Sequence, residues 1–284
     1  MTKTQFRNAS EAMYADHLTM IGLTHQYEKQ WGTHKPDFTI TKDAAFTEVV
    51  AIADVKDLCY TPEDDAALAV GQMISICRNP ALRTRRHIQG VWRQFEACSD
   101  YPCILVLASG GDTLPDAHSV MAAMLGDLTI SVSTSMADDC LMKFTQFFGE
   151  NGKMIDKDGK PMNTRLSAIG LLSSTYPDQM YSGFTDKVKE HGDQFLAEDT
   201  GEAAMRAYVN DCLHLKAELT DAGYDLDSSV TQVAYVVNPL AAKAFPKASL
   251  ARGYVKVWER DLSNQTVALT YDWAKHPKPS LPIA

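Results

Sequence analysis

The sequence has no cysteine pattern that would build a metal centre or a disulfide framework. Its six cysteines are scattered over 284 residues, no two of them form a C-x-x-C pair, and no pair of histidines completes a zinc-site spacing. We therefore expect buried, reduced thiols. A chain of this length can bury roughly 75% of the surface that its unfolded form exposes, so it needs no covalent cross-links.

Long apolar runs and targeting segments are also lacking. No stretch of about 18 apolar residues is present, which argues against a membrane-spanning helix. The first residues, MTKTQFRNASEAMYADHL, have neither the apolar core of a signal peptide nor the profile of a transit peptide. We expect a cytoplasmic protein without a membrane partner.

Positive charge is scarce in this chain. It carries 27 Lys and Arg against 36 Asp and Glu, which gives a formal net charge of −9. Proteins that coat long duplex DNA are usually basic, so an extended nucleic-acid footprint is disfavoured. A local basic patch stays open, and the excess of acids fits a site rich in carboxylates equally well.

The motifs of several enzyme classes are missing. The sequence has no G-x-S-x-G nucleophile elbow, no Walker Lys-Ser/Thr and no G-x-G-x-x-G. The segment SGGD at 109–112 follows a predicted strand and is best interpreted as a plain turn. Serine hydrolases and the common nucleotide-binding enzymes are thereby disfavoured.

What the sequence does contain is an ordered series of helix and strand patterns. The early elements are a helix over 10–23 capped by Ser10, strands over 24–31, 36–42 and 45–54, helices over 61–79 and 80–98, and a buried strand over 102–109. A tight turn at 41–44 would join the second and third strands. The order α-β-β-β-α-β predicts a three-strand meander, with the fourth strand brought alongside it.

The rest of the chain is expected to extend this α/β core. A helix over 114–125 and a strand over 127–133 come first, then strands from Leu166 and over 232–239 that join the same sheet, and two strands within 253–273. Residues 178–223 are polar and helical in pattern. We predict a single domain over 1–284, with a mixed sheet and a helical insertion at about 176–225.

A small set of acidic residues in the early part of the chain points to metal chemistry. Pro36-Asp37 opens the second predicted strand and Glu48 lies in the third, so both carboxylates could share one face, a few ångströms apart. Two such carboxylates repel unless a cation lies between them or one is protonated. Oxygen ligands with open coordination positions suit Mg²⁺ or Mn²⁺. Glu11, on the first helix, could supply a third acid or merely compensate the helix N-terminus. Glu28 is a further candidate, or a solvent-facing strand residue.

Glu11, Pro36-Asp37 and Glu48 within FTEVV, on this predicted core, resemble the PD-(D/E)xK nuclease superfamily, whose fold is called restriction-endonuclease-like. The similarity is closer to bacterial and phage-type members, and it extends loosely to TLPDAHSVMAAMLGDLTI, RLSAIGLL and VVNPLAAKAF. The resemblance implies metal-dependent hydrolysis of phosphodiesters. It also implies that Asp37 and Glu48 are metal ligands and that Glu11 is an accessory acid of the metal site.

One position departs from that pattern. Two residues after Glu48, where the superfamily usually has a Lys that positions the attacking water and offsets phosphate charge, this chain has Val50. A cation from elsewhere could take that place, the metal alone could suffice, or catalysis could be lost.

The expected donor of such a cation is the arginine-rich helix over 80–98. Arg86, Gln89 and Arg93 fall along one side of it, and an arginine there would hold a phosphate rather than act as a base. A solvated basic face is the alternative. Lys35 could also touch a phosphate, whereas Lys56 is expected beyond the strand end and exposed.

The function expected from the sequence is therefore a nuclease with a two-acid Mg²⁺ site, with DNA preferred to RNA as the substrate. The alternative is a catalytically inactive descendant that binds nucleic acid or protein. The sequence leaves the oligomeric state open, and a homodimer is compatible with it.

Overall fold

The computed structural model describes residues 6–59, 66, 80–109, 114–126, 129–132, 142–145, 151–156, 158, 160–175, 201–221, 230–261 and 267–272. The described helices are α1 (Ala9–Met20), α3 (Pro80–Val91), the 3₁₀ turn η1 (Glu96–Cys98), α4 (Ala117–Leu125), α6 (Gly201–Asp221) and α7 (Lys247–Leu250). The described strands are β1 (Thr24–Tyr27), β2 (Phe38–Thr41), β3 (Val49–Leu58), β4 (Cys103–Ser109), β5 (Thr129–Val132), β6 (Met142–Thr145), β7 (Leu166–Thr175), β8 (Val230–Val237), β9 (Val255–Arg260) and β10 (Val267–Asp272).

The chain separates into two compact units, one of residues 1–173 with 232–284 and the other of residues 174–231. The predicted insertion at about 176–225 falls within the second unit, whose described helix is α6. The predicted helix over 61–79 lies outside the described residues apart from Ala66.

The first unit is built on an eight-stranded mixed sheet of order β1-β2-β3-β4-β7-β8-β9-β10. Strands β1, β2 and β3 form an antiparallel meander, and β4 and β7 then continue in parallel to β3. Strand β9 is parallel to β8 and antiparallel to β10. The α/β class and the mixed sheet are thus confirmed, as is the arrangement of the first four strands.

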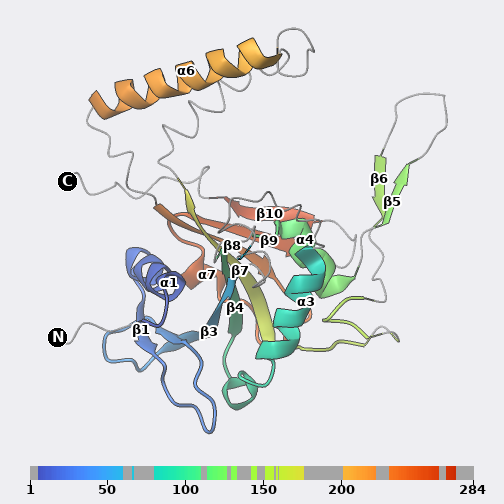
Figure 1. Ribbon diagram of the computed structural model, residues 1–284. Coiled ribbons are helices and arrows are strands. Elements are labelled where there is room, and N and C mark those ends of the chain that lie inside the picture. The colour runs from blue at the N-terminus through green and yellow to red at the C-terminus, as the bar shows by residue number, and fades with distance from the viewer. Residues whose placement is uncertain are drawn as a thin grey trace. The chain divides into compact units, whose positions relative to one another are not determined.

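Two apolar clusters hold helices against the two faces of this sheet (Figure 1). One cluster joins α1 and α7 to alternate residues of the central strands, such as Ala51 and Ala53 of β3. The other joins α3 and α4 to the intervening residues, such as Ile52 and Leu58. Because successive side chains of a strand point to opposite faces, β3 and β4 are buried on both sides. This explains the uninterrupted apolar run of β4.

The N-cap of the first helix lies two residues earlier than predicted, and the helix ends shortly before a glycine. Asn8, rather than the predicted Ser10, is the N-cap: its side chain accepts a hydrogen bond from the Glu11 N–H at 2.8 Å. Ser10 is inside the helix and buried. Gly22 has a φ of +78°, a left-handed conformation that suits the chain reversal into β1.

The hairpin between β2 and β3 differs from the prediction in a way that matters for the site. Residues 42–48 form a wide loop in place of a tight turn, and β3 begins at Val49, four residues later than expected. Asp43 organises this loop, since its carboxylate accepts hydrogen bonds from the backbone N–H (2.9 Å) and the hydroxyl of Thr47. Phe46 has a φ of +57°, which ends any extended strand there.

A close approach between β7 and β8 depends on a glycine. A Cβ at Gly170 would lie 3.1 Å from the Tyr235 ring, so any larger residue would require that ring to shift by a few tenths of an ångström. The Tyr235 hydroxyl lies 3.3 Å from that of Tyr14 on α1, and both side chains are fully buried. The two hydroxyls therefore satisfy one another inside an apolar cluster.

None of the helices within the described residues has the length and apolar character needed to cross a membrane.

The central strand should dominate stability. Leu105 on β4 is fully buried, so Leu105→Ala should lower the free energy of unfolding by about 2–5 kcal/mol through lost contacts and a cavity. Leu82 on α3 is 49% exposed, and Leu82→Ala should change the free energy of unfolding by about 0.5 kcal/mol or less. Urea denaturation followed by circular dichroism measures both, and equal effects would contradict the described packing.

Candidate functional site

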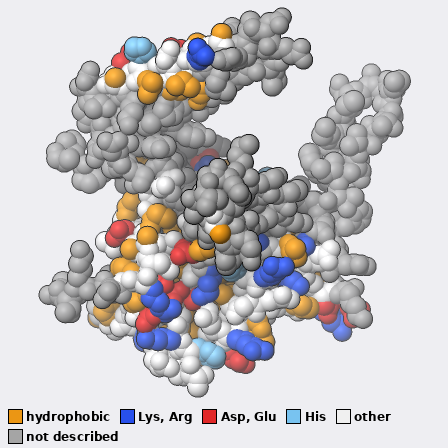
Figure 2. Space-filling model, viewed as in Figure 1, with side chains coloured by type: hydrophobic (Ala, Val, Ile, Leu, Met, Phe, Trp, Pro, Cys, Tyr) orange, Lys and Arg blue, Asp and Glu red, His pale blue; other side chains and the backbone are white. Residues whose placement is uncertain are grey.

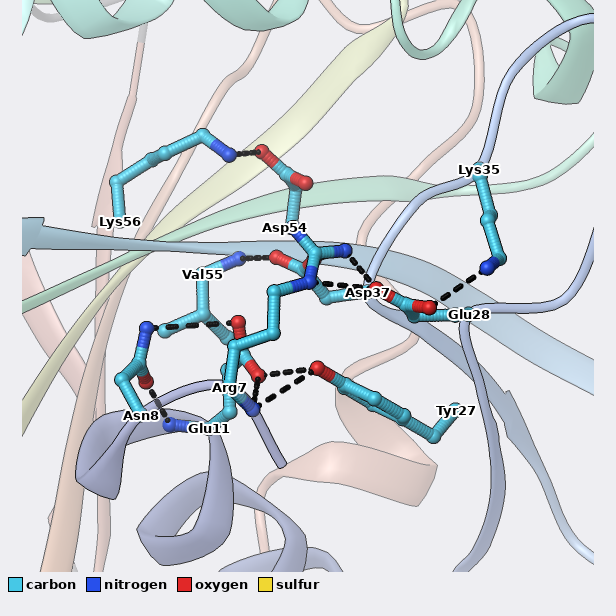
Figure 3. Close-up of polar contacts among 10 residues, drawn as sticks. All are labelled: Arg7, Asn8, Glu11, Tyr27, Glu28, Lys35, Asp37, Asp54, Val55 and Lys56. Carbon is cyan, nitrogen blue, oxygen red and sulfur yellow. Dashed lines mark hydrogen bonds and ion pairs between the residues drawn. The ribbon is translucent and has the colours of Figure 1, made fainter. Parts of the chain in front are cut away.

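The site lies where β2 and β3 separate. The antiparallel register pairs Phe38 with Ala53, which places Asp37 opposite Asp54 just beyond the end of the β2 ladder. There the backbone N–H of Val55 donates to Oδ2 of Asp37 at 2.7 Å. The Asp37 side chain thus replaces the main-chain acceptor that a longer β2 would have supplied. This bond fixes its carboxylate beside that of Asp54 (Figure 3).

The two carboxylates form a buried like-charge pair. Asp37 is 2% exposed and Asp54 is fully buried. Burial, together with the charge of Asp54, raises the pKa of Asp37 to about 7. Oδ1 of Asp54 has no hydrogen-bond donor among the described residues. The pair therefore either holds a proton near neutral pH or requires a cation.

Lys56 provides a positive charge from the same strand. Its Nζ lies 2.6 Å from Oδ2 of Asp54, and its side chain is one-third exposed. Ala53 and Val55 belong to the cluster under α1, whereas Ile52 belongs to the cluster under α3 and α4. Side chains two positions apart on a strand share a face, so Asp54 and Lys56 both project towards the α3 side.

A second group of charges borders Asp37 on its exposed side. Nη2 of Arg7 lies 3.4 Å from Oδ1 of Asp37 and also pairs with Glu28. Nζ of Lys35 lies 2.6 Å from the other oxygen of Glu28. Glu28 itself has a φ of +50° just after β1, where its N–H donates to the backbone carbonyl of Asp37 at 2.8 Å. Glu28 thus links two cations to the edge of the acid pair.

Glu11 is close to this group but does not share the space between the two aspartates. Its Oε2 accepts hydrogen bonds from the Arg7 backbone N–H, at 2.9 Å, and from the Tyr27 hydroxyl. Its Oε1 lies 3.4 Å from the Asn8 side-chain amide. The structure therefore gives Glu11 the task of anchoring the segment before α1. Its predicted role as a metal ligand has no support in this geometry.

Glu48 lies at the other end of the hairpin. It precedes β3 in the loop, its side chain is 59% exposed, and it pairs with Lys42. The expectation that Asp37 and Glu48 lie a few ångströms apart is wrong, because β3 starts four residues later than predicted and its register places Asp54 opposite Asp37. Val50, two residues after Glu48, is a buried core residue on the α1 side.

The predicted arginine-rich helix over 80–98 is shorter than expected: α3 ends at Val91, so Arg93 lies beyond it. Arg86, Gln89 and Arg93 are all exposed, whereas the buried side of α3 presents Ile88 and Val91 to the sheet. The α3 residue that the site influences is His87. Burial and the charges of Arg83 and Lys56 lower its pKa.

No three His, Cys, Asp or Glu side chains among the described residues are grouped to hold a metal ion. The predicted three-acid group of Glu11, Asp37 and Glu48 is thus not formed. A two-carboxylate site is still chemically suited to Mg²⁺, which is commonly bound by one or two carboxylates with waters and substrate phosphates as its other ligands. The unpartnered Oδ1 of Asp54 beside Asp37 fits such an ion.

A comparison with known proteins finds no family model, no curated protein and no solved structure that matches the chain. The site must therefore be interpreted from its own geometry.

Sequence analysis did not consider Asp54. It placed Lys56 beyond the strand end and exposed, whereas Lys56 lies inside β3 with its side chain one-third exposed. The pattern of the nucleases that this chain resembles ends in an acid followed two positions later by Lys. Asp54-Val55-Lys56 has that spacing, whereas Glu48-Val49-Val50 does not.

The acid pair should make divalent-ion binding depend on pH. Without metal, Asp37 in the folded protein holds a proton that the unfolded chain releases at lower pH. The contribution of Asp37 to the free energy of unfolding therefore falls as pH rises from about 4 to about 7. A divalent ion must displace that proton, so the rise in melting temperature caused by Mn²⁺ should be larger at about pH 8 than at about pH 6.

Differential scanning fluorimetry across this pH range measures the effect. Asp54→Asn should abolish the pH dependence of the Mn²⁺-induced rise in melting temperature. Glu48→Gln, which removes an exposed acid of the same hairpin, should leave that pH dependence in place. A Mn²⁺ effect that is independent of pH and of Asp54 would contradict binding at the pair.

Proposed function

We propose that the protein is a metal-dependent nuclease of the PD-(D/E)xK type, with DNA as the preferred substrate. The observation that carries this proposal is the buried pair of Asp37 and Asp54 on adjacent strands, with Lys56 on the same face. The described order α1, β1, β2, β3, α3, β4 agrees with the restriction-endonuclease-like core that the proposal requires.

Each of the three residues would have a distinct task. Asp37 and Asp54 would hold a divalent ion, which when bound supplies an activated water and offsets charge on the phosphate. Lys56, as an ammonium with three donors and no acceptor, would hold the attacking water or a phosphate oxygen next to that ion. The hydrogen bond from Val55 keeps Asp37 oriented throughout.

The pair also favours catalysis over mere binding of nucleic acid. A protein that only bound nucleic acid would have no need for two adjacent buried carboxylates, which repel both phosphate and one another. The main argument for an inactive descendant was Val50. That argument loses its force once Lys56, rather than residue 50, occupies the lysine position of the motif.

Substitution of the three residues tests this proposal. With Mg²⁺ or Mn²⁺ and linear DNA, Asp37→Ala and Asp54→Ala should reduce cutting to that of a no-enzyme control. Lys56→Ala should lower the rate by about 10²-fold or more, the scale on which losing one charge-stabilising group acts. Gel assays on single- and double-stranded DNA and on RNA measure this.

Glu48→Ala is the matched control, because it removes an exposed acid of the same hairpin without touching the pair. Cutting that persists in both the Asp37 and the Asp54 variants would refute the site. A folded wild-type protein that cuts none of these substrates with either metal would refute the enzyme.

The arginine-rich helix supplies a separate test. Because Arg86 on α3 and Arg93, which follows α3, are both exposed and form no ion pair with the acid pair among the described residues, Arg86→Ala and Arg93→Ala should leave the cutting rate at saturating DNA unchanged, in contrast to Lys56→Ala. A loss of rate in either arginine variant as large as that of Lys56→Ala would show that α3 supplies the catalytic cation.

A further inference from the structure

We infer that Arg7 and Lys35, both held by Glu28, form a subsite for a backbone phosphate of the nucleic acid, next to the phosphate that is cut. This inference rests on the proposed function for the identity of its ligand. Arg7 is the link between the two places, since its guanidinium contacts both Glu28 and Asp37.

The two cations are built into position but remain open to solvent. The side chains of Arg7 and Lys35 are 56% and 51% exposed, and they bind opposite oxygens of the same carboxylate (Figure 3). Exposed ion pairs of this kind add little to stability, typically about 0–1 kcal/mol. A contribution to folding is therefore a weak reason for placing two cations here.

The main chain beneath Arg7 is also fixed. Its N–H donates to Oε2 of Glu11 at 2.9 Å, and the same oxygen accepts the hydroxyl of Tyr27 on β1. Glu28 holds the guanidinium from the end of β1. Anchors on α1 and on the β1 edge thus place the guanidinium beside Asp37, and a fixed guanidinium is well suited to hold phosphate oxygens in a planar, two-pronged contact.

The local charge balance favours an anion only once a cation is bound. The ion pairs of Figure 3 comprise three bases, Arg7, Lys35 and Lys56, and three acids, Glu28, Asp37 and Asp54. Their formal charges cancel when all are ionised, and a divalent ion at the acid pair makes the sum positive. A phosphate is then attracted to the exposed cations of this group.

The wider surface makes a local subsite more plausible than an extended one. On the described part of the face in Figure 2, basic and acidic side chains lie interspersed rather than as a continuous basic surface. The chain also carries a formal net charge of −9. Contacts with nucleic acid should therefore be few, and each should contribute a measurable share of the salt dependence of binding.

Binding can be measured without cutting. Fluorescence anisotropy of a labelled DNA oligonucleotide, with the Asp54→Asn variant and without metal, gives Kd over a range of salt concentrations. In this variant three bases face two acids, so the group is positive without a bound ion. Adding Arg7→Ala or Lys35→Ala should weaken binding and lower the slope of log Kd against log salt by about 0.7–0.9 each. Lys42→Ala is the matched control, because Lys42 forms an exposed pair with Glu48 at the far end of the hairpin, and it should change neither quantity.

Substitution of Glu28 tests whether this residue positions the two cations or only repels DNA, because the two roles change DNA affinity in opposite directions. Removing an acid that merely repels DNA should tighten binding. If Glu28 positions Arg7 and Lys35, Glu28→Gln should weaken binding although it makes the protein less negative, and Glu28→Asp should restore part of the loss. Glu48→Gln, which removes the acid of the control pair, should not weaken binding.

The outcomes distinguish this inference from the proposed function. If wild-type protein does not cut DNA but its binding depends on Arg7, Lys35 and Glu28 as described, the subsite stands and the nuclease proposal fails. If cutting requires Asp37 and Asp54 but Arg7→Ala and Lys35→Ala leave Kd and the salt slope unchanged, the nuclease stands and the subsite is refuted. Tighter binding by Glu28→Gln would also refute it.

Discussion

The hydrogen bond from the Val55 N–H to Oδ2 of Asp37 is the contact on which the candidate site depends. At this point β2 leaves β3, and an unpaired N–H on a buried strand would be costly. The carboxylate of Asp37 satisfies it and is thereby held next to Asp54. The Asp37 side chain thus satisfies the backbone N–H of β3 and, by the same hydrogen bond, is held beside a second carboxylate that repels it.

The charges around this pair are arranged in two groups with different surroundings. Lys56 stands on the α3 side of the sheet with Asp54, partly covered by protein. Arg7 and Lys35 stand at the edge, more than half exposed, and share Glu28. Charge interactions are stronger where water is excluded. In the proposed nuclease, the inner group would therefore act on the bound phosphate, and the outer group would bind a neighbouring phosphate of the chain.

Elements with a single strong signal could be predicted from the sequence. The apolar run of β4 lies within one residue of its predicted position, because a strand buried on both faces has no polar alternation to misread. The start of β7 at Leu166 was likewise predicted. The α/β class and the meander followed from the order of such segments.

The acid pair could not be derived in the same way, since it depends on register. Thr47 and Glu48 continue the alternating pattern of β3 in the sequence, but the bonds of Asp43 and the left-handed conformation of Phe46 make them loop residues. The observed register then places Asp54, six residues after Glu48, opposite Asp37. Arg7 was missed for another reason: it precedes α1, where no periodic pattern exists to place it.

The buried contact between Tyr14 and Tyr235 has a consequence for how the protein is made. Helix α1 packs on residues from β8, α7 and β9, which are synthesised more than 200 residues later. A chain still emerging from the ribosome has β2 and β3 but lacks much of the core that α1 covers. Contacts so distant in sequence form late and slowly. The scaffold around the aspartates is therefore completed only after β8, α7 and β9 have left the exit tunnel.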